Sequence, residues 1–109
     1  MLYKEGNGMK DRHKNEQTEL LFRALLSVET EEECAALFAD LCTYKEVEEM
    51  SRRLWAAKRL SEGKIYTDIA SETGLSTATI SRVNTALRYG AGGYSSVLER
   101  ICAVDGNDE

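Results

Sequence analysis

The sequence predicts an all-α protein of about six helices, and three observations support this fold class. The chain of 109 residues contains no proline, and most of its segments are rich in Ala, Leu, Glu, Lys and Arg, which favour helices. Apolar residues recur at intervals of three and four along these segments, as on one face of a helix. Ser, Thr and Gly stand where such segments begin and end. A chain of this length is expected to form one domain, with a modest core that favours association with a second copy.

The helical domain is expected over residues 15–104, between a flexible polar tail at 1–14 and an acidic tail at 105–109. Its first helix, at about 15–28, carries a broad apolar stripe. The capping box Thr30–Glu33 then opens a second helix.

The longest helix is expected to start at a second capping box, Thr43–Glu46, and to end near Glu62, with Gly63 after it. Two further helices lie within 66–88. A glycine-rich connection then leads to a final short helix at about 96–104, with Ser96 at its start. The core side chains expected from the longest helix are Val47, Met50, Leu54, Trp55, Ala57 and Leu60.

The stretch at 66–88 has the spacing of a helix-turn-helix. Ala70 is small enough for two helices to cross closely, Gly74 takes the left-handed conformation that ends the first helix, and Ser76 caps the second. An ordinary helical hairpin with a glycine turn would explain any one of these residues, whereas their combination favours DNA binding. The buried face of the second helix is expected to consist of Ile80, Val83 and Leu87.

The opposite face of that second helix carries short polar groups, a methyl group and a guanidinium, which suit the major groove of DNA. Arg82 could contact a base, a phosphate, a ligand or a surface carboxylate. Its polar neighbours on the same face favour a contact with DNA. Arg88, Lys64 and Arg59 are expected to contact the DNA backbone rather than the bases. The candidate DNA-binding residues are Ser76, Thr77, Ala78, Ser81, Arg82, Thr85, Arg88 and Lys64.

The formal net charge of −5 is unevenly distributed along the chain. Residues 43–100 contain nine Lys and Arg against seven Asp and Glu, a balance of +2, whereas residues 1–42 have a balance of −4. DNA affinity depends on the local face, so the predicted reading unit is the basic part of an acidic protein. Because the excess is small, moderate and salt-sensitive binding is expected for each subunit.

The first two helices carry more apolar surface than a small domain can easily hide. A helical hairpin folded back on its own domain is one explanation. The other is a dimer interface made by exchanging these helices between chains, which we favour because paired reading helices bind paired half-sites. The apolar side chains concerned are Leu20, Leu21, Phe22, Leu25, Leu26, Leu37, Phe38 and Leu41.

Membrane, secreted and catalytic classes are not expected. No apolar run approaches the roughly 20 residues that span a bilayer, and the chain does not begin with a signal-peptide pattern. Cys34, Cys42 and Cys102 lack metal-ligand spacing and are expected to be reduced thiols in a cytoplasmic protein. The sequence has no phosphate-binding loop, nucleophile elbow or zinc pattern, so neither an enzyme nor a metal site is expected. Three close carboxylates are expected to form a solvated face and helix caps: Glu46, Glu48 and Glu49.

A set of residues within about 16–104 matches a known family. The most specific is the run Ala-Thr-Ile-Ser-Arg at Ala78–Arg82; the others are Leu41–Thr43, Glu49, Arg53, Leu60, Gly63 and Gly74. On these residues the chain resembles the tryptophan repressor family, and within it the YerC/YecD-like branch. The resemblance implies an all-helical, intertwined homodimer. Such a dimer represses transcription by placing paired helix-turn-helix units in successive major grooves of double-stranded DNA.

In tryptophan-responsive members of that family, two arginines from opposite subunits sandwich the indole ring. A planar guanidinium suits this role because it stacks on an aromatic face while pairing with a carboxylate. The resemblance gives four candidate ligand-binding residues here: Arg53 and Arg82 as the two arginines, with Thr43 and Thr79 as polar contacts.

Two departures from the family pattern argue against tryptophan as a tight co-repressor. Val83 stands where the family has a glycine that leaves space beside the indole. Ala86 replaces a serine that meets the amino group of the ligand, and a methyl group cannot accept a hydrogen bond. An ammonium without its acceptor would cost about 1–3 kcal/mol. No cofactor is therefore expected.

Two functions from different classes remain open. One is a sequence-specific, DNA-binding transcriptional regulator that acts as a repressor, with Thr77, Ser81 and Arg82 selecting the operator. The other is a protein-interaction adaptor that uses the helix-turn-helix fold without sequence-specific DNA binding.

Overall fold

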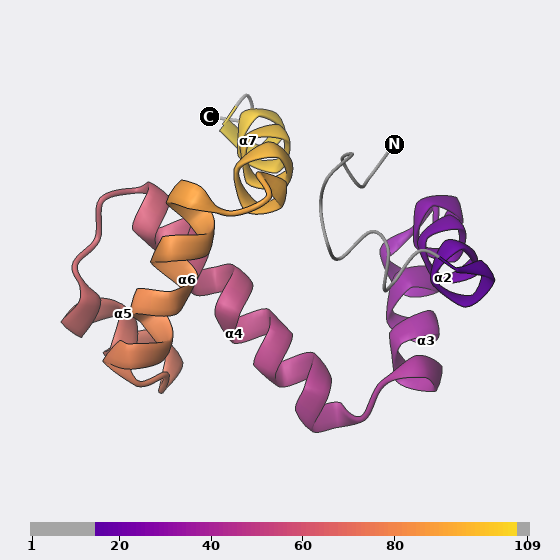
Figure 1. Cartoon of the computed structure of the whole chain (residues 1–109), viewed down its shortest axis with the longest axis horizontal. Helices are drawn as coiled ribbons and strands as arrows, with labels where there is room; N and C mark the ends of the chain where they lie inside the picture. The colour runs from indigo at the N-terminus through magenta and orange to yellow at the C-terminus, as the bar shows by residue number, and fades with distance from the viewer. Residues whose placement is uncertain (1–14, 107–109) are drawn as a thin grey trace. The chain divides into compact units, whose positions relative to one another are not determined.

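The computed structural model describes residues 15–106, and every regular element in that range is an α-helix (Figure 1), which confirms the predicted all-α class. None of the described helices is long and apolar enough to cross a membrane. The N-terminal tail predicted at 1–14 lies outside the described residues. The helices are α2 (Glu16–Ser27), α3 (Glu31–Leu41), α4 (Tyr44–Ser61), α5 (Tyr66–Thr73), α6 (Thr77–Tyr89) and α7 (Gly93–Gly106).

Contacts divide the chain into two compact units, Met1–Thr43 and Tyr44–Glu109, whereas the sequence predicts one domain over 15–104. The first unit contains α2 and α3, and no side chain of either helix is buried. Thr30 Oγ1 accepts a hydrogen bond from the N–H of Glu33 at 3.0 Å, as the capping box predicts. The return bond to Glu33 Oε1 comes from the N–H of Glu29, at 2.8 Å, rather than from Thr30.

The second unit has a core where α4, α5, α6 and α7 meet. Ile69 of α5 and Ile80 of α6 are its largest completely buried side chains. Ala56 and Ala57, also completely buried, are small enough to let neighbouring helices approach α4 closely. Ile80, Val83 and Leu87 of α6 are buried, which confirms the buried face predicted for the second helix of the helix-turn-helix. The core consists of Ala56, Ala57, Leu60, Ile69, Leu75, Ile80, Val83, Leu87 and Leu98.

Only the last turns of α4 contribute to this core. Ala57 and Leu60 are buried as predicted, but Met50 and Leu54 are 37% and 41% exposed and Trp55 is 45% exposed. The core positions predicted for these three residues are wrong in the single chain. The sequence shows that α4 has apolar side chains along its length, but not which of them another helix covers.

The end of α4 is a Schellman motif, as Gly63 predicts. Gly63 has a φ of 85°, and its N–H donates to the carbonyl of Leu60 at 3.0 Å. The N–H of Lys64 donates to the carbonyl of Arg59 at 3.1 Å. These bonds satisfy carbonyls at the end of the helix and set the direction in which the chain leaves toward α5.

α7 starts earlier and ends later than the sequence predicts. It begins at Gly93, so the glycine-rich connection is shorter than expected and Ser96 lies inside the helix rather than at its start. Tyr94 packs against the core, and this tertiary contact outweighs the low helix propensity of the glycine beside it. The helix extends to Gly106, so the first two residues of the acidic tail predicted at 105–109 are helical.

Candidate nucleic-acid interface

The turn between α5 and α6 is fixed by backbone and side-chain hydrogen bonds. Gly74 has a φ of 78°, and its N–H donates to the carbonyl of Ala70 at 2.8 Å, as expected of a left-handed helix end. Ser76 Oγ accepts a hydrogen bond from the N–H of Thr79 at 3.1 Å and so caps α6. The roles predicted for Gly74 and Ser76 in the turn are confirmed.

Thr73 adds a contact that the sequence pattern does not predict. Its hydroxyl donates to the carbonyl of Ile69 at 2.8 Å and accepts from the N–H of Leu75 at 3.1 Å. One side chain thus joins the last turn of α5 to the segment that leads into α6. The signal for it is the Thr-Gly pair, since Thr hydroxyls bond nearby backbone groups at turns.

α6 presents a polar and basic face to solvent, opposite its buried apolar residues. The helix contains two arginines and no acidic residue, so its charged side chains are both positive. Thr85 Oγ1 donates to the carbonyl of Ser81 at 3.1 Å, and Arg82 Nη2 lies 3.4 Å from Thr79 Oγ1. All eight candidate DNA-binding residues are exposed: Ser76, Thr77, Ala78, Ser81, Arg82, Thr85, Arg88 and Lys64.

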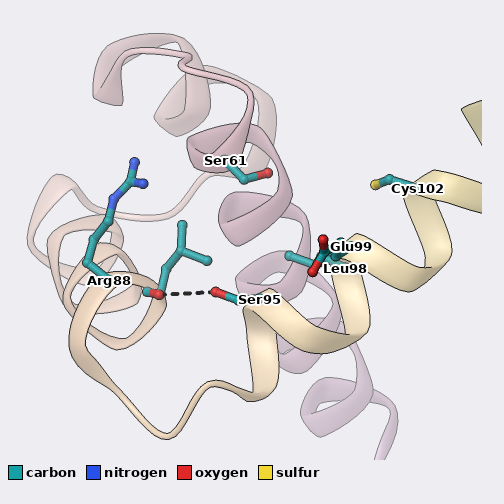
Figure 2. A pocket seen from close by; sticks show the side chains of 7 residues that line it. Ser61, Arg88, Ser95, Leu98, Glu99 and Cys102 are labelled. Carbon is teal, nitrogen blue, oxygen red and sulfur yellow. Dashed lines mark hydrogen bonds between the residues drawn. The ribbon is translucent and has the colours of Figure 1, made fainter.

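Arg88 connects α6 to α4. Its Nε donates to Asn84 Oδ1 at 3.2 Å, and its Nη2 donates to the carbonyl of Leu60 at 3.4 Å. Arg88 also lines a cavity of about 250 Å³ between α4, α6 and α7 (Figure 2). In that cavity Ser95 Oγ donates to the carbonyl of Leu87 at 3.4 Å. The sequence does not predict this cavity, whose other lining residues are Ser61, Leu98, Glu99 and Cys102.

Arg59, for which the sequence predicts a contact with the DNA backbone, binds two carboxylates of the chain. Its Nε and Nη2 donate to Oε1 and Oε2 of Glu72 on α5, each at 3.0 Å. Its Nη1 donates to Glu62 Oε1 at 2.6 Å. The indole Nε1 of Trp55 donates to Glu72 Oε1 at 3.0 Å. Trp55, expected in the core, is instead part of a polar link between α4 and α5.

These bonds shift the pKa values of the charged groups. The Arg59 guanidinium, and after it the indole N–H of Trp55, lowers the pKa of Glu72. The pKa of Glu62 is also lowered, chiefly by the hydrogen bond from the Lys58 ammonium, which lies 2.6 Å away. Both carboxylates are therefore ionised at neutral pH. Two positive and two negative groups share this site, so their formal charges cancel.

A second hollow, of about 280 Å³, lies between α4, α6 and the start of α7. It brings together three of the four candidate ligand-binding residues, Arg53, Thr79 and Arg82. The fourth, Thr43, belongs to the first unit. The lining includes two residues that the sequence does not assign to a ligand site, Glu49 and Tyr94, and the two departures from the family pattern, Val83 and Ala86.

Residues that line the hollow are already in contact with other groups of the chain. Arg53 Nη1 donates to Glu49 Oε2 at 3.3 Å. Val83 is only 4% exposed and belongs to the hydrophobic core, so its branched side chain forms part of the wall.

The three cysteines are unpaired thiols. The part of the chain that the structure describes holds no cluster of His, Cys, Asp and Glu suited to a metal ion.

Comparisons with known proteins agree on one family. The family model for the Trp repressor protein matches residues 16–102. The chain is 43% identical over 91 residues to the uncharacterized protein YerC of Bacillus subtilis (strain 168), covering 84% of this chain and 88% of that protein.

Two solved structures are similar to the chain over nearly their whole length. A TrpR-like protein from Eubacterium eligens ATCC 27750 has a TM-score of 0.81 at 46% identity, covering 84% of this chain and 94% of that one. A protein from Staphylococcus aureus, described as a candidate Trp repressor, has a TM-score of 0.81 at 39% identity, covering 87% and 95%.

Proposed function

Because this chain belongs to the Trp repressor protein family, we propose that it is a sequence-specific DNA-binding regulator that represses transcription. The observation that carries the proposal is the exposed face of α6, which is polar, basic and free of acidic residues. A helix of this kind, held rigidly by a capped turn, suits insertion into the major groove. Such a regulator acts in the cytoplasm, where it meets DNA, and we assign it no catalytic role.

Within the proposed DNA interface we assign different tasks to different residues. Thr77, Ser81 and Arg82 read base edges, because they are exposed and lie on the first two turns of α6. Lys64 and Arg88 lie outside these turns and contact phosphates, which position the protein without selecting sequence. The other residues of the interface are Ser76, Ala78 and Thr85.

The regulator acts as a homodimer in this proposal. α2 and α3 have no buried side chain, and Leu20, Leu26 and Leu41 are 59%, 80% and 52% exposed in the single chain. Two helices that bury so little of their apolar surface need a partner to be stable. A second copy supplies one and brings two reading helices to paired half-sites.

In this proposal tryptophan is not a tight co-repressor. The guanidinium of Arg53 already has a carboxylate partner in Glu49, so the carboxylate of an amino acid would have to displace it. Val83 occupies the wall of the hollow, and Ala86 offers no acceptor to an ammonium. Arg53, Thr79 and Arg82, with Thr43, remain the candidate contacts of an effector of other chemistry.

Selection of bound duplexes from a random library, carried out at low salt, tests the proposed function. We expect an enriched motif with two-fold symmetry, because a symmetric dimer binds two equivalent half-sites. A library without an enriched motif would contradict sequence-specific binding. It would favour the other class of function, a protein-interaction adaptor built on the same fold.

A further inference from the structure

Glu72 is the residue through which α4 and α5 make a polar connection. Its two carboxylate oxygens accept three hydrogen bonds at 3.0 Å, two from Arg59 and one from Trp55. Both donors lie on α4, whereas Glu72 lies on α5. The fork of a guanidinium fixes both the distance and the direction of a carboxylate, which apolar packing does not.

Glu62 offers an internal comparison, because it binds the same arginine without joining two helices. It accepts from Arg59 Nη1 and from Lys58 Nζ, each at 2.6 Å. Both partners lie three or four residues before it in the chain. Glu62 therefore neutralises the basic end of α4, whereas Glu72 joins α4 to α5.

The same network accounts for the state of Arg59. All three of its guanidinium nitrogens donate to carboxylates, and its side chain is 22% exposed. Its Cζ also lies 5.9 Å from the centroid of the Trp55 ring, within the range of a cation–π contact. Arg59 is therefore engaged within the chain by two carboxylates and one aromatic ring.

We propose that Glu72 is a positioning residue of the helix-turn-helix, which holds α5 at one orientation against α4 and uses Arg59 for that purpose instead of for DNA. α5 leads through the turn into α6, so the orientation of α5 sets that of the reading helix. The effect on DNA recognition rests on the proposed function; the placement of α5 rests on the contacts alone.

The substitution Glu72→Gln separates this role from a simple charge effect, because the two predict opposite signs. If Glu72 were only an acidic group near DNA, its neutralisation would raise the affinity for every duplex. As a positioning residue, its loss lowers the affinity for the selected duplex by about tenfold and leaves the affinity for a shuffled duplex unchanged or higher. Equal increases for both duplexes would overturn the proposal.

Glu62→Gln is the matched control, since it removes the same charge from the same arginine. It is expected to leave the ratio of the two affinities within about twofold. Trp55→Phe keeps an aromatic ring, although a smaller one, and removes the indole N–H donor. It is therefore expected to lower the ratio in the same direction as Glu72→Gln and by less. An equal fall in Glu62→Gln and Glu72→Gln would also overturn the proposal.

Hydrogen exchange of backbone amides tests the placement of α5 without DNA. In Glu72→Gln the amides of Ile69 and Gly74 are expected to exchange about five- to tenfold faster than in the wild type, with no change in Glu62→Gln. Unchanged exchange in Glu72→Gln would contradict the role of Glu72 even if DNA binding were confirmed. Conversely, faster exchange in a protein that selects no DNA motif would support it while the proposed function fails.

Discussion

Arg53 and Glu49 lie one turn apart on α4, and their side chains form an ion pair with 3.3 Å between Nη1 and Oε2. From the sequence, Glu49 is expected on a solvated face and Arg53 in a ligand site. In the structure both residues line the same hollow. Arg52 Nη1 lies 4.0 Å from the same carboxylate. A carboxylate of the chain therefore holds the guanidinium that a ligand carboxylate would need.

Tryptophan is expected to show no micromolar binding when titrated into the protein in a calorimeter. Three features oppose binding: the ion pair of Arg53, the core position of Val83 and the missing acceptor at Ala86. Indole-3-propionate, which lacks the ammonium, separates these causes. If it binds where tryptophan does not, the missing acceptor is the main obstacle. Micromolar affinity for tryptophan would show that Glu49, Val83 and Ala86 do not prevent its binding.

Replacement of Gly74 by alanine is expected to destabilise the protein by about 1–2 kcal/mol, because an L side chain is strained in the left-handed region. A Cβ at this position meets no atom within 4 Å, so the effect isolates the backbone conformation. Gly93→Ala is the control, in a helix and equally unobstructed. It is expected to stabilise by about 0.4–1 kcal/mol. Urea unfolding measures both changes, and the same sign for both would contradict the turn described for Gly74.

Leu26→Lys tests the dimer. Leu26 is 80% exposed in the single chain, so in a monomer the change would alter stability by no more than about 0.5 kcal/mol. In a dimer that covers α2, the buried ammonium is expected to shift the protein toward monomers in sedimentation equilibrium. Gln17→Lys, also exposed on α2 and also adding one positive charge, is expected to leave the association state unchanged. A monomeric wild-type protein would contradict the dimer directly.

Stability is expected to fall at acidic pH in part because of Glu72. Its pKa is lowered in the folded state, chiefly by Arg59, so the unfolded chain takes up the proton first as pH falls. The contribution of Glu72 is therefore complete above about pH 4.3, where free glutamate titrates, and is lost as pH falls through the lower folded-state pKa. Unfolding midpoints of wild type and Glu72→Gln, compared from neutral to acidic pH, are expected to converge. A constant difference would show that the charge of Glu72 does not contribute.

The sequence predicts those features that depend on neighbours along the chain. Gly74 and Ser76 determine their turn through local backbone preferences, and the apolar spacing of α6 identifies its buried face. Features that depend on how two helices meet are not predicted. The hydrogen bond between Arg59 and Glu72 joins residues 13 apart in the chain. An arginine can pair with any nearby carboxylate, so the residue types alone do not identify this pair. The exposed position of Leu54 is missed for a related reason, since periodicity identifies an apolar face but not the surface that covers it.

Base reading by α6 is tested most directly by the affinity of the purified protein for its selected duplex relative to a shuffled one, measured at several salt concentrations. We expect a ratio of roughly a thousandfold or more. Arg82→Ala is expected to reduce this ratio by losing about 1–3 kcal/mol on the selected duplex, whereas Arg88→Ala weakens both duplexes alike. A ratio near one at every salt concentration, or equal losses from both variants, would contradict base reading by α6.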